Sequence, residues 1–140
     1  MKFSYTLKTI ASPERIWEVW TDVEHWSNWD TELKDACLKV PFSLGAVGEL
    51  TPKRGRVSTF KVSQFSPGKS YTFTLKLPFC RLNIHRYLTT RLDGLYFTHE
   101  VSFQGLLAFI FGLLLGRQFK AVLPGVMANV KQIAEAAHQP

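Results

Sequence analysis

The stretch from residue 116 to residue 135, GRQFKAVLPGVMANVKQIAE, decides the fold of this 140-residue chain. Apolar side chains recur in it, and just beyond it, with a period of 3.6 residues, which is typical of an amphipathic helix. The apolar stripe consists of Phe119, Val122, Leu123, Val126, Met127, Val130, Ile133, Ala134 and Ala137. Lys120, Asn129, Lys131 and Glu135 lie off the stripe, and Pro124-Gly125 predicts a kink or a loosened turn. We therefore expect a long C-terminal helix that buries one face.

Upstream of this helix the pattern changes to alternating strands and turns. We expect strands over residues 33–40, 45–50, 57–65, 71–77, 81–92 and 95–103. Ser66-Pro67-Gly68-Lys69 and Asp93-Gly94 are strong turn signals between them. Because consecutive strands usually pair with each other, the pattern predicts an antiparallel meander.

The N-terminal segment adds one strand and two helices. Residues 2–10 alternate, with Phe3, Tyr5 and Leu7 on one face, which predicts a half-buried strand. Ser12-Pro13-Glu14 is a helix start, and a short second helix is expected over residues 23–29. Strands and helices segregated in this way indicate an α+β fold in a single domain, residues 1–140.

A helix laid across a strongly curved sheet cannot touch it everywhere, so apolar side chains from both are expected to line a cavity. Concave apolar sites of this kind are the usual place for a small ligand. Aromatic residues make up 14% of the chain, and they can line such a pocket or simply fill a core.

Four stretches carry a resemblance to a known superfamily: 10–17 (IASPERIW), 22–29 (DVEHWSNW), 92–105 and 116–135. In this order they resemble the START-like, Bet v 1-like (SRPBCC) group of polyketide cyclase/dehydrase and lipid-transport proteins. The resemblance implies a helix-grip fold, in which a curved antiparallel sheet of about six to seven strands wraps around the long C-terminal helix. It implies hydrophobic ligand binding, such as lipid binding, but no particular reaction, because the family has no universal catalytic residues.

His99 is the first candidate for a polar contact with a ligand, since it lies on an apolar strand face; a hydrogen-bonded core histidine is the alternative. His99 and Tyr71 are the candidates for moving a proton. Trp26 and Trp29 are expected at the cavity mouth, and Trp17 and Trp20 in structural packing. The predicted ligand-binding residues are Tyr5, Trp29, Phe60, Tyr71, Phe73, Arg86, Phe97, His99, Val101, Phe119, Leu123 and Met127.

Three functions remain open at this stage. The first is a binding or carrier protein for a small hydrophobic molecule (a lipid, a polyketide-like or an aromatic compound). The second is a polyketide cyclase/dehydratase-like enzyme, and the third is a co-chaperone or stress-related interaction protein. We expect no cofactor and no metal, because Gly45 and Gly48 are wrongly spaced for a dinucleotide site and no third ligand accompanies His85 and His99.

Charge and hydropathy indicate whether the protein binds nucleic acid or membranes. The net charge is +6, but the basic residues are scattered, so we expect no nucleic-acid binding. Cys37 and Cys80 are expected to be reduced, and with no signal-peptide pattern at the N-terminus we expect a cytoplasmic protein. Residues 105–116, GLLAFIFGLLLG, are too short to span a bilayer, so no stable membrane insertion is expected. They could be the buried start of the last helix, a lid over the cavity, or a site of transient membrane contact.

Overall fold

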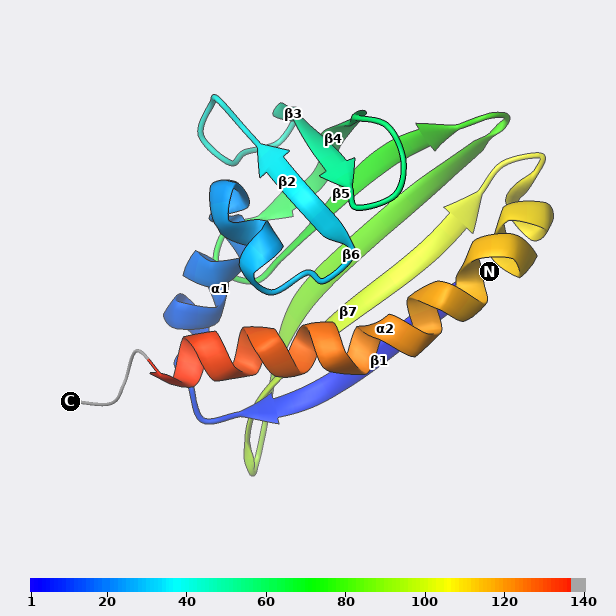
Figure 1. Cartoon of the computed structure of the whole chain (residues 1–140). Helices are drawn as coiled ribbons and strands as arrows, with labels where there is room; N and C mark the ends of the chain where they lie inside the picture. Colours follow the sequence, from blue (N-terminus) through cyan, green and yellow to red (C-terminus); the bar gives the residue numbers. More distant parts are fainter. Residues whose placement is uncertain (137–140) are drawn as a thin grey trace.

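The computed structural model describes residues 1–136, which form one curled sheet and a long helix that crosses it (Figure 1). The strands are β1 (Lys2–Thr9), β2 (Leu33–Cys37), β3 (Val47–Pro52), β4 (Ser58–Ser66), β5 (Ser70–Leu77), β6 (Cys80–Arg91) and β7 (Gly94–Gln104). The helices are α1 (Pro13–Thr21), the 3-10 helix η1 (Val23–Asn28) and α2 (Ala108–Ala136). The predicted α+β order is confirmed.

All seven strands join one antiparallel sheet in the order β1-β7-β6-β5-β4-β3-β2. The meander expected from the turn signals is present, and β1 closes the sheet beside β7. Register shifts in β2 and β4 mark irregularities of the kind that increase local twist. Gly48 lets β3 lie close to β2, since a Cβ there would lie 2.6 Å from the carbonyl oxygen of Cys37.

The helix α1 begins where the sequence predicts. The side chain of Ser12 accepts a hydrogen bond from the amide of Arg15 at 3.1 Å, and Pro13 occupies the first turn. The helix ends at Thr21, and the chain turns directly into η1. This corner places the indole rings of Trp20 and Trp26 inside the fold.

Two strands, β2 and β3, have boundaries that differ by two or more residues from those expected. The strand expected over 33–40 ends at Cys37, because the amide of Leu38 donates to the carboxylate of Glu24 at 3.2 Å rather than to β3. The strand expected to start at residue 45 starts at Val47, because the amide of Ala46 closes a turn onto the carbonyl of Ser43. Both differences arise from local hydrogen bonds that hydrophobic periodicity does not encode.

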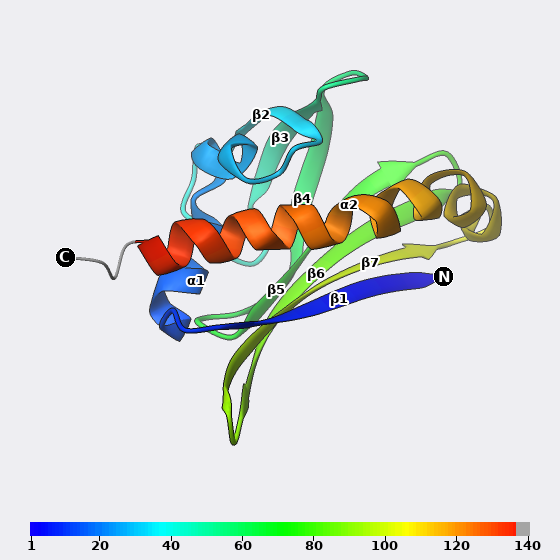
Figure 2. The ribbon, with the colours of Figure 1, turned by 60° about the horizontal axis from the view of Figure 1, so that its bottom comes forward.

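The helix α2 lies over the concave side of the sheet and runs along β1 and β7 (Figures 1 and 2). Its buried residues include Leu123, Met127 and Val130 of the predicted stripe. The helix continues through Pro124-Gly125, where the sequence predicts a kink or a loosened turn, without interruption. Both residues face solvent, where water can satisfy the carbonyl group that Pro124 leaves without a partner.

The segment 105–116 provides the start of α2, but it is not buried. Only Gly112 and Gly116 are buried in its helical part, while five of its large apolar side chains are exposed. The expectation of a buried helix start is therefore wrong. By length and composition α2 is the one helix among residues 1–136 that could cross a membrane, but its C-terminal half packs into the core.

Candidate functional site

A row of three inward-facing side chains crosses the middle of the sheet. Arg86 on β6 is directly opposite Tyr71 on β5, and it is also directly opposite His99 on β7. All three are buried, and residues paired in this way have Cβ atoms about 5 Å apart. The pairing therefore gathers a guanidinium, a phenol and an imidazole at one place on the concave face.

Arg86 is a buried cation enclosed by aromatic rings. Its guanidinium carbon lies 4.8 Å from the ring centre of Trp29, 5.0 Å from that of Trp26 and 5.1 Å from that of Phe73. Its Nη1 donates to the Tyr71 hydroxyl at 2.8 Å. Within residues 1–136 the guanidinium forms no ion pair, and its buried Nε–H has no hydrogen-bond partner. Such an orphaned buried donor is uncommon and requires an explanation.

The imidazole of His99 is held in one tautomer. The indole Nε1–H of Trp20 donates to His99 Nε2 at 2.9 Å. Because an indole can only donate, Nε2 must be the acceptor, and the proton of the neutral ring is on Nδ1. No described residue accepts a hydrogen bond from Nδ1. Burial, with a smaller effect from the charge of Arg86, lowers the pKa of His99 well below its ordinary value, so the ring is neutral near pH 7.

The carbonyl oxygen of Trp20 fixes the other side of the row. It accepts hydrogen bonds from the Tyr71 hydroxyl at 2.7 Å and from the Trp26 indole at 2.9 Å. Burial raises the pKa of Tyr71, and the neighbouring charge of Arg86 opposes this only in part. Tyr71 is therefore a neutral phenol whose proton already has an acceptor.

Asp30 is an acidic residue whose pKa is affected by the charge of Arg86. Burial raises the pKa of its carboxyl group, and the charge of Arg86 opposes the rise. Its Oδ1 accepts a hydrogen bond from the amide of Glu32 at 3.0 Å. The sequence analysis did not single out Asp30, although its place directly after Trp29 was a signal that a carboxylate follows the aromatic corner.

The structure buries most of the predicted ligand-binding residues. Tyr5 lies opposite His99 on the edge strand β1 but is 39% exposed, and Phe119 is partly buried. Trp26, expected at a cavity mouth, is fully buried. The remaining predicted residues are buried in the core: Trp29, Phe60, Tyr71, Phe73, Arg86, Phe97, His99, Val101, Leu123 and Met127. His85 forms a hydrogen bond with Thr72 on the other face of the sheet from His99, so these two histidines do not lie together.

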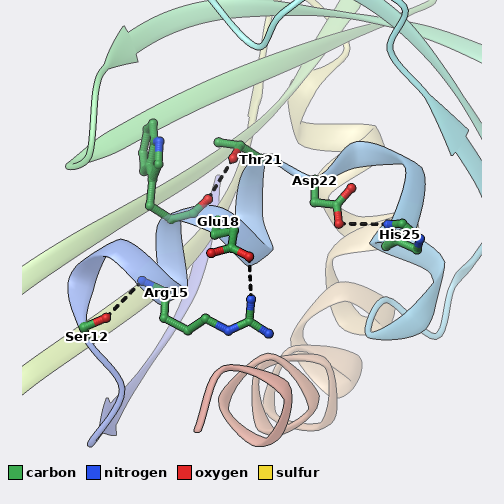
Figure 3. A network of polar contacts seen from close by, with 7 residues as sticks. Ser12, Arg15, Glu18, Thr21, Asp22 and His25 are labelled. Atoms are coloured by element: carbon green, nitrogen blue, oxygen red, sulfur yellow. Dashed lines mark hydrogen bonds and ion pairs between the residues drawn. The ribbon is translucent and has the colours of Figure 1, made fainter. Parts of the chain in front are cut away.

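A surface hollow of about 230 Å³ lies next to this row, between α1, η1 and the C-terminal part of α2. Its rim is polar: Arg15 pairs with Glu18 at 2.8 Å, and His25 pairs with Asp22 at 2.8 Å (Figure 3). Trp29 lines the hollow and also contacts the guanidinium of Arg86 and the ring of His99. Trp29 therefore separates the hollow from the unpartnered donors behind it.

A second hollow, of about 530 Å³, lies on the opposite, polar face of the sheet, and Lys61, Lys76 and Arg81 are among the residues that line it. Trp29 is the one predicted ligand-binding residue that lines either hollow. Aromatic side chains fill the space where the sequence predicted an open cavity. Trp26 packs on Phe60 and Phe73, with ring centres 5.4 and 5.0 Å apart.

A curled antiparallel sheet that grips a long C-terminal helix defines the helix-grip class of proteins, the class that the sequence predicted. The model of the polyketide cyclase/dehydrase and lipid transport family matches residues 2–135. The chain belongs to this family. No curated protein sequence matches it.

Solved structures share the fold at low sequence identity. Protein MLL2253 from Mesorhizobium loti is 16% identical with a TM-score of 0.73, covering 99% of this chain and 100% of that one. The protein Ara h 8.0201 is 11% identical with a TM-score of 0.70, covering 97% of this chain and 98% of that one. The di-domain aromatase/cyclase StfQ of the steffimycin biosynthetic pathway is 13% identical with a TM-score of 0.75, covering 97% of this chain and 51% of that one. At these identities the likeness establishes the fold alone.

Proposed function

We propose that the protein binds a small, flat hydrophobic molecule that carries an oxygen acceptor, such as a carboxylate, an enolate or a carbonyl group. The observation that carries the proposal is the buried Arg86 Nε–H, which has no acceptor, together with the Nδ1–H of His99 on the neighbouring strand. A buried donor without an acceptor costs about 1–3 kcal/mol, and more when it is charged. An oxygen placed between the two donors would remove that cost.

The surroundings of these donors suit the rest of such a ligand. Trp26, Trp29 and Phe73 present ring surfaces around the guanidinium, and flat apolar molecules stack on such surfaces. Because side chains fill this space, a ligand must displace one of them. Trp29 is the side chain to move, since it both lines the hollow beside α1 and contacts the guanidinium of Arg86. Membership of a family whose description includes lipid transport agrees with binding of an apolar molecule.

The experiment compares two probes of the same shape. We expect 2-naphthoate, which carries a carboxylate, to bind at least tenfold more tightly than 2-methylnaphthalene, measured by quenching of tryptophan fluorescence and by calorimetry. In Arg86→Met the preference for the carboxylate should disappear, because a hydrogen bond from a charged donor contributes about 1.5–3 kcal/mol, or 10- to 100-fold. Lys69→Glu, which also lowers the net charge but at an exposed turn, should keep the preference. Equal binding of both probes to the unaltered protein would refute the proposal.

A second candidate function, cyclisation or dehydration of a polyketide-like substrate, uses the same donors. Arg86 Nε–H and His99 Nδ1–H would stabilise negative charge that develops on a substrate oxygen, as an oxyanion hole does. The structural similarity to StfQ favours testing it. Incubation with a linear poly-β-ketone, followed by mass spectrometry, should give a product lighter by one water per aldol dehydration; unchanged substrate at saturating protein would exclude it.

A further inference from the structure

Six large apolar side chains project into solvent at one end of the molecule. We call this group the apolar tip. It consists of Phe79 in the β5–β6 turn together with Leu106, Phe109, Ile110, Leu113 and Leu114 at the start of α2. Each of them is at least 49% exposed. Single exposed apolar residues are ordinary on protein surfaces, but a group of them at one place indicates an interaction site.

The fold holds the apolar tip in place. The carbonyl oxygen of Phe79 accepts a hydrogen bond from the amide of Leu107 at 3.0 Å, which ties the β5–β6 turn to the start of α2. Gly105 has a φ of +118°, and a Cβ there would lie 2.9 Å from the same carbonyl oxygen. Gly112 and Gly116 let the helix pack directly on the side chains of Met1 and Phe3. This side of the helix faces the N-terminal strand, and Leu113 and Leu114, between the two glycines, point outward.

Positive charge borders the apolar tip. The outward stripe that begins with Ile110 and Leu113 continues, one turn further along α2, to Arg117 and Lys120, both exposed. Lys76 and Arg81 are paired at the base of the β5–β6 turn, and Lys2 lies at the nearby end of β1.

Negative charge is scarce there. No Asp or Glu occurs in residues 67–92 or 101–134, which supply both parts of the apolar tip. Glu32 approaches the helix, where it accepts a hydrogen bond from Gln118 at 3.4 Å.

We propose that the apolar tip docks on the surface of an anionic lipid bilayer. Arg117 follows Ile110 by seven residues, which is about 10 Å along a helix. Interfacial segments insert their apolar side chains about 5–10 Å deep, so Arg117 and Lys120 would lie at the level of the lipid phosphates. Anionic lipid is the occupant that complements this charge. A second copy of the chain would instead bring two cationic borders together, which is unfavourable.

The test uses the whole chain and vesicles of stated composition. We expect co-sedimentation with vesicles of phosphatidylcholine containing about 30 mol% phosphatidylserine, and much weaker binding to phosphatidylcholine alone or at high salt, because each basic residue near an anionic surface adds about fivefold to binding. Leu113→Glu and Phe109→Ser should each lower the partition coefficient on the order of tenfold or more. Arg117→Glu should lower it only for the anionic vesicles.

Leu92→Glu is the matched control. Leu92 is fully exposed at the tip of the β6–β7 hairpin, well away from the start of α2 in both views of the ribbon (Figures 1 and 2). The Leu92→Glu variant should bind vesicles as the unaltered protein does. Circular dichroism should show that all variants are folded, since every altered residue is exposed. Failure of the unaltered protein to bind anionic vesicles at low salt would overturn the proposal. A dimer that Leu113→Glu converts to a monomer, seen by light scattering, would also overturn it and assign the apolar tip to self-association. Neither result depends on the ligand proposed above.

Discussion

Replacing Arg86 by methionine separates a role in binding from a role in folding. Methionine fills a similar volume but carries no charge and no N–H groups. If Arg86 is retained for a ligand, the fold itself should not need its charge. We therefore expect Arg86→Met to fold at least as stably as the unaltered protein while losing the preference for a carboxylate.

The contacts of Arg86 give the contributions that determine how much the free energy of unfolding should change in Arg86→Met. Burying a cation costs several kcal/mol; within residues 1–136 no side chain forms a direct ion pair with Arg86, and its interaction with the carboxyl group of Asp30 offsets the cost only in part. The unpartnered Nε–H adds about 1–3 kcal/mol to the cost. Against this, the rings around the guanidinium contribute about 2 kcal/mol as cation–π contacts, and the hydrogen bond to Tyr71 contributes about 1.5–3 kcal/mol.

The opposing terms nearly cancel, with the balance on the side of the cost. We expect the free energy of unfolding to rise by about 0–3 kcal/mol in Arg86→Met, as it does when other buried ionic groups are replaced by apolar ones. A rise of that size raises Tm by up to about 10 °C in a domain of this length. The Tyr71 hydroxyl keeps its acceptor, the carbonyl oxygen of Trp20, so no new donor is orphaned.

Urea unfolding followed by tryptophan fluorescence and by circular dichroism measures the change. Two further variants serve as comparisons for the stability change in Arg86→Met. Arg86→Ala leaves a cavity and should lose about 2–4 kcal/mol, by analogy with other large-to-small changes. Arg81→Met alters an exposed arginine on the same strand and should change stability by less than about 0.5 kcal/mol. A loss of more than 2 kcal/mol in Arg86→Met, with a native spectrum, would show that the fold requires the charge and would refute the reasoning.

Three further predictions concern stability. Because the pKa of His99 is lowered in the folded protein, His99 contributes stability above the ordinary histidine pKa of about 6.5 that is lost as the pH falls; the unaltered protein should lose stability between pH 7.5 and 5.5 relative to His99→Gln, measured by urea unfolding at each pH, and parallel curves would contradict this. The pKa of Asp30 is raised, so its contribution is present at low pH and is lost as the pH rises through the folded-state pKa; Asp30→Asn should remove this part of the pH dependence, and parallel curves for the two proteins would contradict it. Gly125→Ala, with open space around the new methyl group, should raise the free energy of unfolding by about 1 kcal/mol, whereas Gly116→Ala, whose methyl group would meet the ring of Phe3, should lower it by about 1–3 kcal/mol; changes of the same sign would be inconsistent with the packing of α2 on β1.

Hydrophobic periodicity was sufficient to predict the elements of this fold. The alternation through Tyr71, Phe73 and Leu75 predicted β5 and its inward face, because a half-buried strand must alternate. The helical stripe that includes Leu123 and Met127 predicted the buried face of α2 for the same kind of reason. Each pattern indicates which side of the element faces the core, and both predicted buried faces were confirmed.

The central pairing of the candidate site was less accessible to sequence analysis, because it depends on one turn. A hairpin centred on Asp93-Gly94 would place His99 opposite Leu88. In the structure the loop is Leu92-Asp93, Arg91 pairs with Gly94, and His99 lies opposite Arg86 instead. Gly94 has a φ of +143°, which glycine adopts readily, so the loop shifted by one residue is accommodated. A shift of two residues keeps the same face, so the inward direction was predicted correctly while the neighbour of His99 was not.

The exposure of the apolar tip could not be predicted from the sequence either. Residues 105–116 contain no polar side chain, so no periodicity distinguishes the buried side of this helix from the exposed side. The distinction arises from close packing, since Gly112 and Gly116 contact Met1 and Phe3, more than 100 positions away in the chain. Gly112 and Gly116 indicate the buried side of the helix only when the residues packed against them are known.

The hydrogen bonds of the central row also bear on the choice between binding and catalysis. A general base needs a free lone pair, but the Nε2 lone pair of His99 already accepts from Trp20. A general acid needs a proton that it can release, but the proton of Tyr71 is held by the carbonyl oxygen of Trp20, and burial raises its pKa. Arg86 Nε–H and His99 Nδ1–H are the groups that remain available, and both are donors. Such a site can hold or polarise an oxygen atom without removing a proton, so any reaction there would have to rely on shaping the substrate and on stabilising its charge.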